Sequence, residues 1–418
     1  MLNNILNILE RWHPRRDKKM TEPCFPQEIF DAIIDQLKDD TDTLKEISLA
    51  STILSPRTRV HLFSSANLSS KTDCVRLRKL ITQSPHLARY FTSLTFEFHS
   101  RSVARSLPAK ILRKLVNIRE LTLILGDFSN FRPSVISALG ARSYTSLALI
   151  LIDFDSVTDI CPLTRNSPSL KTMHIVAPRF FGLDVPCDHE GVVPSPTSLS
   201  ITDTESDAGT ILGSILSPRQ CPISMERVDT LLILISHTNP ALIEQLNHFL
   251  DEMSVERALT SFHVTHTSTV PPTLTLHISH VNTLMIDISA YRNSDEPKSI
   301  IGWWITAFLD IEADCALEVV RLKIDVKNMP SLSAPDYGDM WKQMNEALHR
   351  IPSLKTVDLA FYNMSPDWPW DEAEARMIEG FKMRDPQREL NIHVTTFSSS
   401  LPLFSFGSCN CTKGDADQ

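Results

Sequence analysis

The sequence predicts an α/β protein with a parallel sheet, preceded by a short all-α segment. Short β-like runs beginning at residues 94, 121, 147, 173 and 199 are separated by 27, 26, 26 and 26 residues. A helical stretch and a Pro or Asn turn precede many of these runs, as at 109–115. Alternation within each run places every second residue on one face, which is typical of half-buried strands.

Length and composition limit the classes of function. The chain has 418 residues, enough for two or more domains on a prior of about 150 residues each. A net charge of −9 argues against a nucleic-acid binder that relies on a broad basic face. Eight scattered cysteines favour reduced, partly buried thiols in a cytoplasmic and/or nuclear protein. No run of 18 apolar residues occurs, so we expect no transmembrane helix and no membrane partner.

Residues 1–21 are predicted to form an N-terminal arm or a short amphipathic helix. Apolar residues such as Leu2 and Ile5 come first, and the basic cluster that includes Arg15 and Arg16 follows. A signal peptide has the opposite order, with positive charge before the apolar run. The segment is therefore not expected to direct secretion.

Residues 22–68 are predicted to form one small domain of three helices. The first helix begins near Pro26, whose fixed φ suits a first turn. Its apolar positions have helical spacing: Ile29, Phe30, Ile33, Ile34 and Leu37. A capping box of Thr43 with Glu46 predicts the second helix, and Ser55 as N-cap before Pro56 predicts the third. Residues 66–68 are predicted to be extended.

Such a domain buries little apolar surface, so it needs a neighbour or a partner for stability. Blocks of sequence in this domain carry a family resemblance. They read Phe25-Pro26-Gln27-Glu28-Ile29, Ile33-Ile34-Asp35-Gln36-Leu37, Thr43-Leu44-Lys45-Glu46-Ile47-Ser48-Leu49-Ala50-Ser51 and Ser55-Pro56-Arg57-Thr58-Arg59-Val60-His61-Leu62-Phe63. In order and spacing they resemble the F-box-like domains that are abundant in mushroom-forming fungi. The chain departs from that pattern at Phe25, where Leu is usual, and at Leu54, where Trp is common.

The resemblance implies that this domain packs on the Skp adaptor subunit of a Skp–cullin–F-box ubiquitin ligase. Carried over by position, it implies the following docking residues: Phe25, Pro26, Glu28, Ile29, Leu49, Ala50 and Leu54. The alternative is that these apolar positions only close the domain's own core, as most apolar residues do.

Residues 69–396 are predicted to form an irregular leucine-rich-repeat-like α/β solenoid with a parallel sheet. The order of helix, turn and Leu-x-x-Leu-x-Leu strand and the repeat of 20–29 residues favour it. Pro-Ser-Leu-Lys-Thr occurs at 168–172 and at 352–356, before a strand each time. The gaps between the β-like runs lengthen after Ile201, and a further strand is expected at 273–278. An open α/β sheet of another kind would share the alternation of strands and helices.

Residues 397–418 are expected to form a disordered tail.

Proteins that pair an F-box with leucine-rich repeats hold a protein substrate on the repeats, so the resemblance implies a non-enzymatic adaptor. The alternative is a recognition or scaffold protein with a degenerate F-box. No phosphate-binding loop or nucleophile elbow occurs, and no cofactor or metal is expected. His263, His266, His277 and His280 have His-x-x-His spacing, but residues i and i+3 on a strand point to opposite faces. We interpret them as ordinary strand histidines.

The tryptophans are the remaining candidates for binding. Trp303 and Trp304 lie in an apolar stretch and are predicted to be core residues. Trp368 and Trp370 lie in a predicted loop, where exposed aromatic residues serve as binding anchors as often as core residues.

Overall fold

The computed structural model describes most of the chain between residues 26 and 395. The described ranges are 26–106, 108–181, 193–202, 223–235, 240–252, 259–266, 270–288, 298–312, 314–325, 335–362 and 389–395. The predicted arm at 1–21, the predicted tail at 397–418 and Phe25, Trp368 and Trp370 lie outside these residues. The prediction of a domain boundary after residue 68 stays a prediction.

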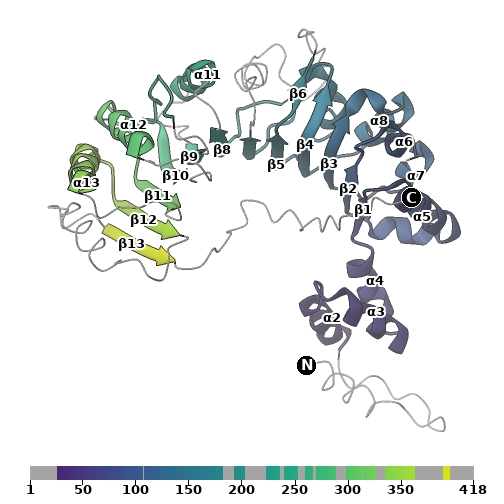
Figure 1. Cartoon of the computed structure of the whole chain (residues 1–418). Helices are drawn as coiled ribbons and strands as arrows, with labels where there is room; N and C mark the ends of the chain where they lie inside the picture. Colours follow the sequence, from purple (N-terminus) through teal and green to yellow (C-terminus); the bar gives the residue numbers. More distant parts are fainter. Residues whose placement is uncertain are drawn as a thin grey trace, which may run out of the picture. The chain divides into compact units, whose positions relative to one another are not determined.

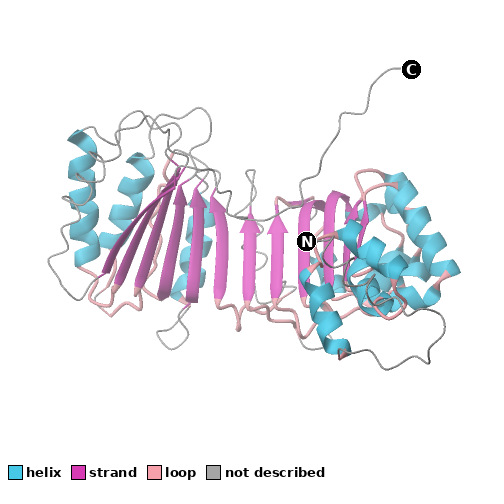
Figure 2. Ribbon diagram, turned by 90° about the horizontal axis from the view of Figure 1, so that it is seen from below, coloured by secondary structure: helices cyan, strands magenta, loops and turns pink. Residues whose placement is uncertain are grey.

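The chain divides into two compact units by its internal contacts. Unit 1 comprises Met1–His174, Pro178–Pro196 and Pro222–Ser224, and unit 2 comprises Ile175–Ala177, Thr197–Cys221 and Met225–Gln418. Both are α/β, and the strand pairs described in them are parallel. Figure 2 shows the arrows of the strands in each unit pointing the same way. The predicted class, α/β with a parallel sheet, is confirmed.

Unit 1 begins with three helices and continues with alternating strands and helices (Figure 1). Its helices and strands are α2 Gln27–Gln36, α3 Thr41–Ala50, α4 Ser55–Leu62, β1 Ser65–Leu68, α5 Lys71–Gln83, η1 Pro85–Tyr90, β2 Ser93–Glu97, α6 Arg101–Ala104, α7 Ala109–Leu112, β3 Glu120–Asp127, η2 Phe128–Asn130, α8 Pro133–Gly140, β4 Ser146–Phe154, η3 Val157–Ile160, α9 Cys161–Thr164, β5 Thr172–Val176 and β6 Arg179–Phe180. Strands β1 to β5 lie in chain order, and β6 pairs with β4. The last two residues of β5 belong to unit 2.

The register of unit 1 follows the spacing read from the sequence. Leu94, Leu121 and Leu147 are direct partners on β2, β3 and β4. The backbone just before each strand repeats one hydrogen bond, since Thr145 N–H donates to the carbonyl of Arg119 at 2.7 Å and Arg119 N–H donates to that of Thr92 at 2.7 Å. Each unit of sequence therefore adds one strand in the same register.

Alternate strand residues and a run of aromatic rings build the core of unit 1. Neighbouring ring centroids lie between 4.4 and 5.6 Å apart along the series Phe96, Phe98, Phe131, Phe128, Phe154 and Phe180. Such tilted and stacked pairs add to the free energy gained from apolar burial. The helices α5 to α8 cover the same face of the strands (Figure 1).

Two leucines in unit 1 have a backbone conformation that is costly for residues other than glycine. Leu125 and Leu151 have φ values of 51° and 54°, in the left-handed region. They lie at matching positions between the pairs Ile124–Ile150 and Gly126–Ile152, so the same backbone conformation occurs at the same place in β3 and in β4. Both side chains are exposed, at 40% and 42%.

Unit 2 repeats the strand–helix order with longer connections. Its described elements are β7 Ser198–Thr202, β8 Thr230–Ile235, α11 Pro240–Asp251, β9 Leu259–His266, β10 Val281–Ile288, α12 Lys298–Leu309, β11 Val319–Asp325, α13 Pro335–His349, β12 Thr356–Tyr362 and β13 Glu389–Thr395. The strands lie in the order β7 to β13. Trp303 and Trp304 on α12 are 7% and 0% exposed, which confirms the prediction that both are core residues.

The prediction of a strand at 273–278 is wrong. These residues form an irregular segment, and the side-chain amide of Asn247 pairs with its backbone. That amide donates to the carbonyl of Thr275 at 2.7 Å and accepts the N–H of His277 at 2.9 Å. Because a side chain satisfies these backbone groups, the alternation of apolar residues does not lead to strand pairing here.

The described cysteines differ in oxidation state. Cys74 and Cys315 are buried free thiols, as expected, whereas Cys161 is disulfide-bonded, so the prediction of reduced cysteines is wrong at that position. None of the helices in the described residues has the length and apolar character needed to cross a bilayer.

Candidate functional site

The three helices α2, α3 and α4, here called the helical module, contain the residues that the resemblance singles out. A small core joins them, made of Ile34, Leu44, Ile47 and Leu54, with Phe30, Leu37 and Leu62 packed against it. Every helix and the turn before α4 contribute to this core. Four fully buried apolar residues are few, so the module gains little free energy from burial.

Local signals explain where the helices of the module begin. Asp40 caps α3, because its carboxylate accepts the N–H of Thr43 at 3.0 Å and the hydroxyl of Thr43 at 2.6 Å. These hydrogen bonds lower the pKa of Asp40. The predicted capping box of Thr43 with Glu46 is therefore wrong, because the N-cap of α3 is Asp40, about one turn before Thr43. Helix α4 has Leu54 as its N-cap and Pro56 in the first turn. The helix therefore begins one residue earlier than predicted, and Ser55 is its first residue instead of its N-cap.

An ion pair that the sequence did not reveal joins the first and third helices of the module. Arg57 donates two hydrogen bonds to the carboxylate of Asp35, both at 2.6 Å, and His61 Nε2 lies 2.8 Å from Asp35 Oδ1. The hydrogen bonds from Arg57 and His61 lower the pKa of Asp35 to about 2. Two parallel bonds to a planar guanidinium fix the angle between helices as well as their separation.

Five of the seven predicted docking residues are exposed. Pro26, Glu28, Ile29 and Ala50 lie at the surface, and the side chain of Leu49 is 88% exposed. Leu54 is only 5% exposed and belongs to the core of the module, so the interpretation as a core residue holds for Leu54. Phe25, the seventh, lies outside the described residues.

Two further exposed apolar residues of the module were not among those predicted. Ile33 is 41% exposed, and Ile53 is 45% exposed. Ile33 lies one helical turn after Ile29 in α2, so the two share a face, whereas Phe30 and Ile34 point to the core. Phe30 and Ile34 have the same spacing of four residues as Ile29 and Ile33, so the sequence pattern does not separate this outer stripe from the inner one.

The interpretation of the four histidines with His-x-x-His spacing as strand histidines is right for two of them and wrong for the other two. His263 and His266 lie on β9, and His277 and His280 lie in the segment before β10. His266 is fully buried, its Nε2 accepts the indole N–H of Trp304 at 3.0 Å, and burial lowers its pKa to about 3. No group of three metal-ligating side chains lies together in the described part of the chain.

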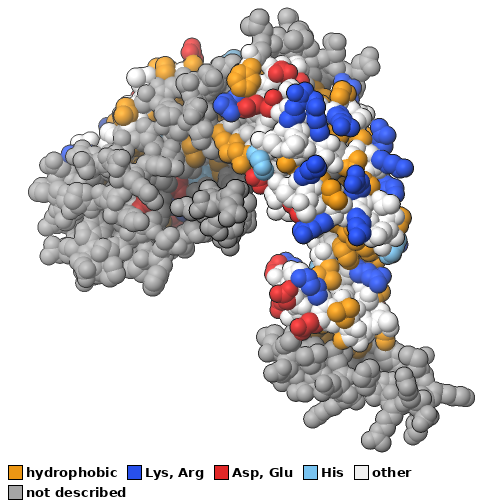
Figure 3. Space-filling model, turned by 45° about the vertical axis from the view of Figure 1, so that its right-hand side comes forward, with side chains coloured by type: hydrophobic (Ala, Val, Ile, Leu, Met, Phe, Trp, Pro, Cys, Tyr) orange, Lys and Arg blue, Asp and Glu red, His pale blue; other side chains and the backbone are white. Residues whose placement is uncertain are grey.

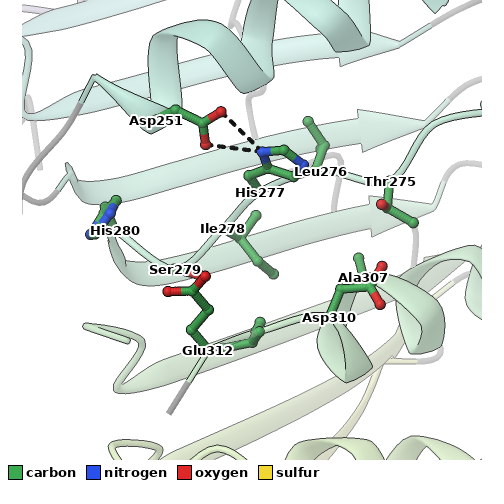
Figure 4. A pocket seen from close by; sticks show the side chains of 11 residues that line it. Asp251, Thr275, Leu276, His277, Ile278, Ser279, His280, Ala307, Asp310 and Glu312 are labelled. Atoms are coloured by element: carbon green, nitrogen blue, oxygen red, sulfur yellow. Dashed lines mark hydrogen bonds and ion pairs between the residues drawn. The ribbon is translucent and has the colours of Figure 1, made fainter. Parts of the chain in front are cut away.

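Unit 2 also contains a pocket of about 310 Å³, between the ends of α11 and α12 (Figure 4). Polar side chains dominate its rim, among them His277, Asp310 and Glu312. Figure 4 shows that Asp251 and His277 point toward one another, and Asp251 Oδ1 lies 2.9 Å from His277 Nδ1. This pair links the end of α11 to the segment before β10, which is a structural role.

The exposed stripe of the helical module is thus the strongest candidate for a functional surface. Leucine and isoleucine side chains on a small domain gain free energy only when another surface covers them. Comparison with known proteins adds no constraint, because no family model and no curated protein matches this chain.

Proposed function

We propose that the chain is the substrate-recognition adaptor of a Skp–cullin–F-box ubiquitin ligase. In this proposal the helical module is an F-box-like domain that docks on the Skp subunit. The observation that carries the proposal is the exposure of Ile29, Ile33, Leu49 and Ile53 on a module of only three short helices. Covering one such side chain completely contributes about 1.5–3 kcal/mol, so a partner that covers several has ample driving force.

The proposal assigns the rest of the described chain to an irregular leucine-rich-repeat-like solenoid that holds a protein target. The parallel strands and the near-constant spacing of β2 to β5 support it. Small polar side chains alternate with the buried residues of the strands and lie on the strand face away from the core, among them Ser93, Thr95, Thr122 and Ser146. Ligase chemistry resides in other subunits, and the adaptor acts by raising the local concentration of its target.

Co-purification of the full chain with a purified Skp-type adaptor tests the docking assignment. The double variant Ile29→Asp and Leu49→Asp places two charges in the proposed interface and should abolish the association. The matched control is Val116→Asp and Leu309→Asp, since these two residues are also exposed apolar residues but lie outside the module. Circular dichroism spectra should be the same for both variants and the wild type.

An equal loss in both variants, or no loss in either, would contradict the docking assignment.

One observation favours a second function, a recognition or scaffold protein with a degenerate F-box. Leu54 stands where the family commonly has Trp, and its side chain lies in the core, so it offers a partner no large side chain. A folded wild-type chain that does not bind the adaptor would select this second function.

A further inference from the structure

Charge is distributed very unevenly along this acidic chain. Residues 69–181 contain 16 lysines and arginines and 7 aspartates and glutamates, a net charge of +9. The whole chain has a net charge of −9, so the residues outside 69–181 together carry a net charge of −18. From Phe98 to Arg119 inclusive there are six lysines and arginines and no aspartate or glutamate. The total charge of the chain thus conceals a strongly basic segment.

The excess lies on the helical layer of unit 1. We define the basic face as seven residues on and beside α5, α6 and α7: Arg78, Lys79, Arg101, Arg105, Lys110, Arg113 and Lys114. Six of them are exposed and Lys114 is half-buried. The helix α5 packs against α6. Figure 3 shows Lys and Arg side chains gathered on this side of unit 1.

These seven cations make no ion pair with a carboxylate in the described chain. Asp73 on α5 lies 3.7 Å from Arg76, which is not part of the basic face. Elsewhere in unit 1, Arg179 is paired with Asp153 at 2.7 Å. Seven like charges on neighbouring helices repel one another, which lowers the stability of unit 1 unless an anionic partner compensates them.

We propose that the basic face binds an acidic segment of a partner protein. Four of the seven residues are arginines, whose planar guanidinium groups pair with carboxylates through two parallel hydrogen bonds. Two exposed apolar residues lie beside them, Val75 at 40% and Val116 at 58% exposure. An acidic protein segment can cover these valines with its own apolar side chains, whereas a nucleic-acid backbone cannot.

Two further observations disfavour a nucleic acid. The helices α5, α6 and α7 contain no aromatic residue, so they offer no aromatic stacking platform for bases. The charge of −18 on the rest of the chain repels a long polyanion, although a short acidic segment is repelled less. The proposal is independent of the docking of the helical module, because the basic face and the exposed stripe of α2 and α3 share no residue.

Fluorescence anisotropy with the full chain tests the proposal. The probe is a labelled 18-residue peptide that repeats Asp-Glu-Leu, and a second peptide repeats Asp-Glu-Gly. The wild type should bind the leucine peptide more tightly than the glycine peptide, and affinity should fall as salt rises. The triple variant Arg78→Glu, Lys79→Glu and Arg113→Glu should weaken binding by about tenfold or more.

The matched control is the triple variant Lys38→Glu, Lys342→Glu and Arg350→Glu, which changes the net charge equally on exposed residues away from the basic face. It should bind as the wild type does. An equal loss in both variants would show an effect of net charge alone and overturn the proposal. Equal affinity for both peptides, or tighter binding of a 20-base-pair DNA duplex or of anionic vesicles, would overturn the assignment to an acidic protein segment.

Discussion

Two leucines of the helical module provide a sharp test, because the structure gives them opposite roles. Leu54 is 5% exposed and is one of four fully buried apolar residues in the module's core. Leu49 is 88% exposed. Truncation to alanine removes the same atoms at both positions, so the difference between the two variants measures burial alone.

The expected magnitudes follow from that difference. Leu54→Ala leaves a cavity in a small core and should destabilise the module by about 2–5 kcal/mol. Leu49→Ala should change the stability of the module by less than about 0.5 kcal/mol. If a Skp subunit covers Leu49, the same substitution should weaken binding by about 1.5–3 kcal/mol, which is roughly tenfold to a hundredfold in Kd.

Hydrogen exchange of the amides in α2, α3 and α4 measures the stability of the module without requiring the whole chain to unfold. Binding of the Skp subunit is measured by titration calorimetry on the same variants. Equal exchange rates in Leu49→Ala and Leu54→Ala would refute the assignment of inside and outside in the module. Unchanged binding by Leu49→Ala would refute the docking role of that side chain.

Three other predictions concern stability. Because the pKa of Asp35 is lowered to about 2, its pairing with Arg57 stabilises the module above about pH 4, and this contribution is lost as the pH falls toward 2; Asp35→Asn should remove that pH dependence in hydrogen exchange. Trp304→Phe leaves buried His266 without the indole hydrogen bond and should cost about 1–3 kcal/mol in urea denaturation, whereas a cost near zero would contradict it. Gly140→Ala would place a methyl group 2.4 Å from a backbone carbonyl of α9 and should cost about 1–3 kcal/mol, measured by the same denaturation; a neutral result would show that α8 and α9 are not packed this closely.

The strands were the most predictable part of the fold, because their signal repeats. The runs at Leu121 and Leu147 each alternate, and their near-constant spacing predicts that they pair directly. Helix α5 was not predicted, although Ser70 and Asp73 form a capping box and Cys74, Leu77 and Ile81 have helical spacing. Residues 273–278 show the opposite failure, since they alternate as a strand does but pair with the side chain of Asn247, a contact that no local pattern reveals.

The candidate site was also predictable only in part, because local spacing shows a helical stripe but not the contacts that the stripe makes. Sequence spacing placed Ile29, Phe30, Ile33 and Ile34 on one broad helical stripe, and it could not say which half faces the core. The structure divides that stripe, since Ile34 is buried and Ile29 is 48% exposed. The ion pair of Asp35 with Arg57 was missed because it joins residues 22 positions apart on different helices.

The paired positive-φ residues Leu125 and Leu151 bear on how the chain tolerates rearrangement. A left-handed leucine costs of order 1–2 kcal/mol, and it recurs at the same place in adjoining stretches of the same length. Adjoining stretches that share the register and the position of the left-handed residue can replace one another in the sheet. Excision of residues 120–145 would join Arg119 directly to Ser146, the partner of Glu120 in the ladder. The shortened chain would keep β2 and β4 in register as neighbours, so the sheet tolerates the loss of one whole unit without a change of register.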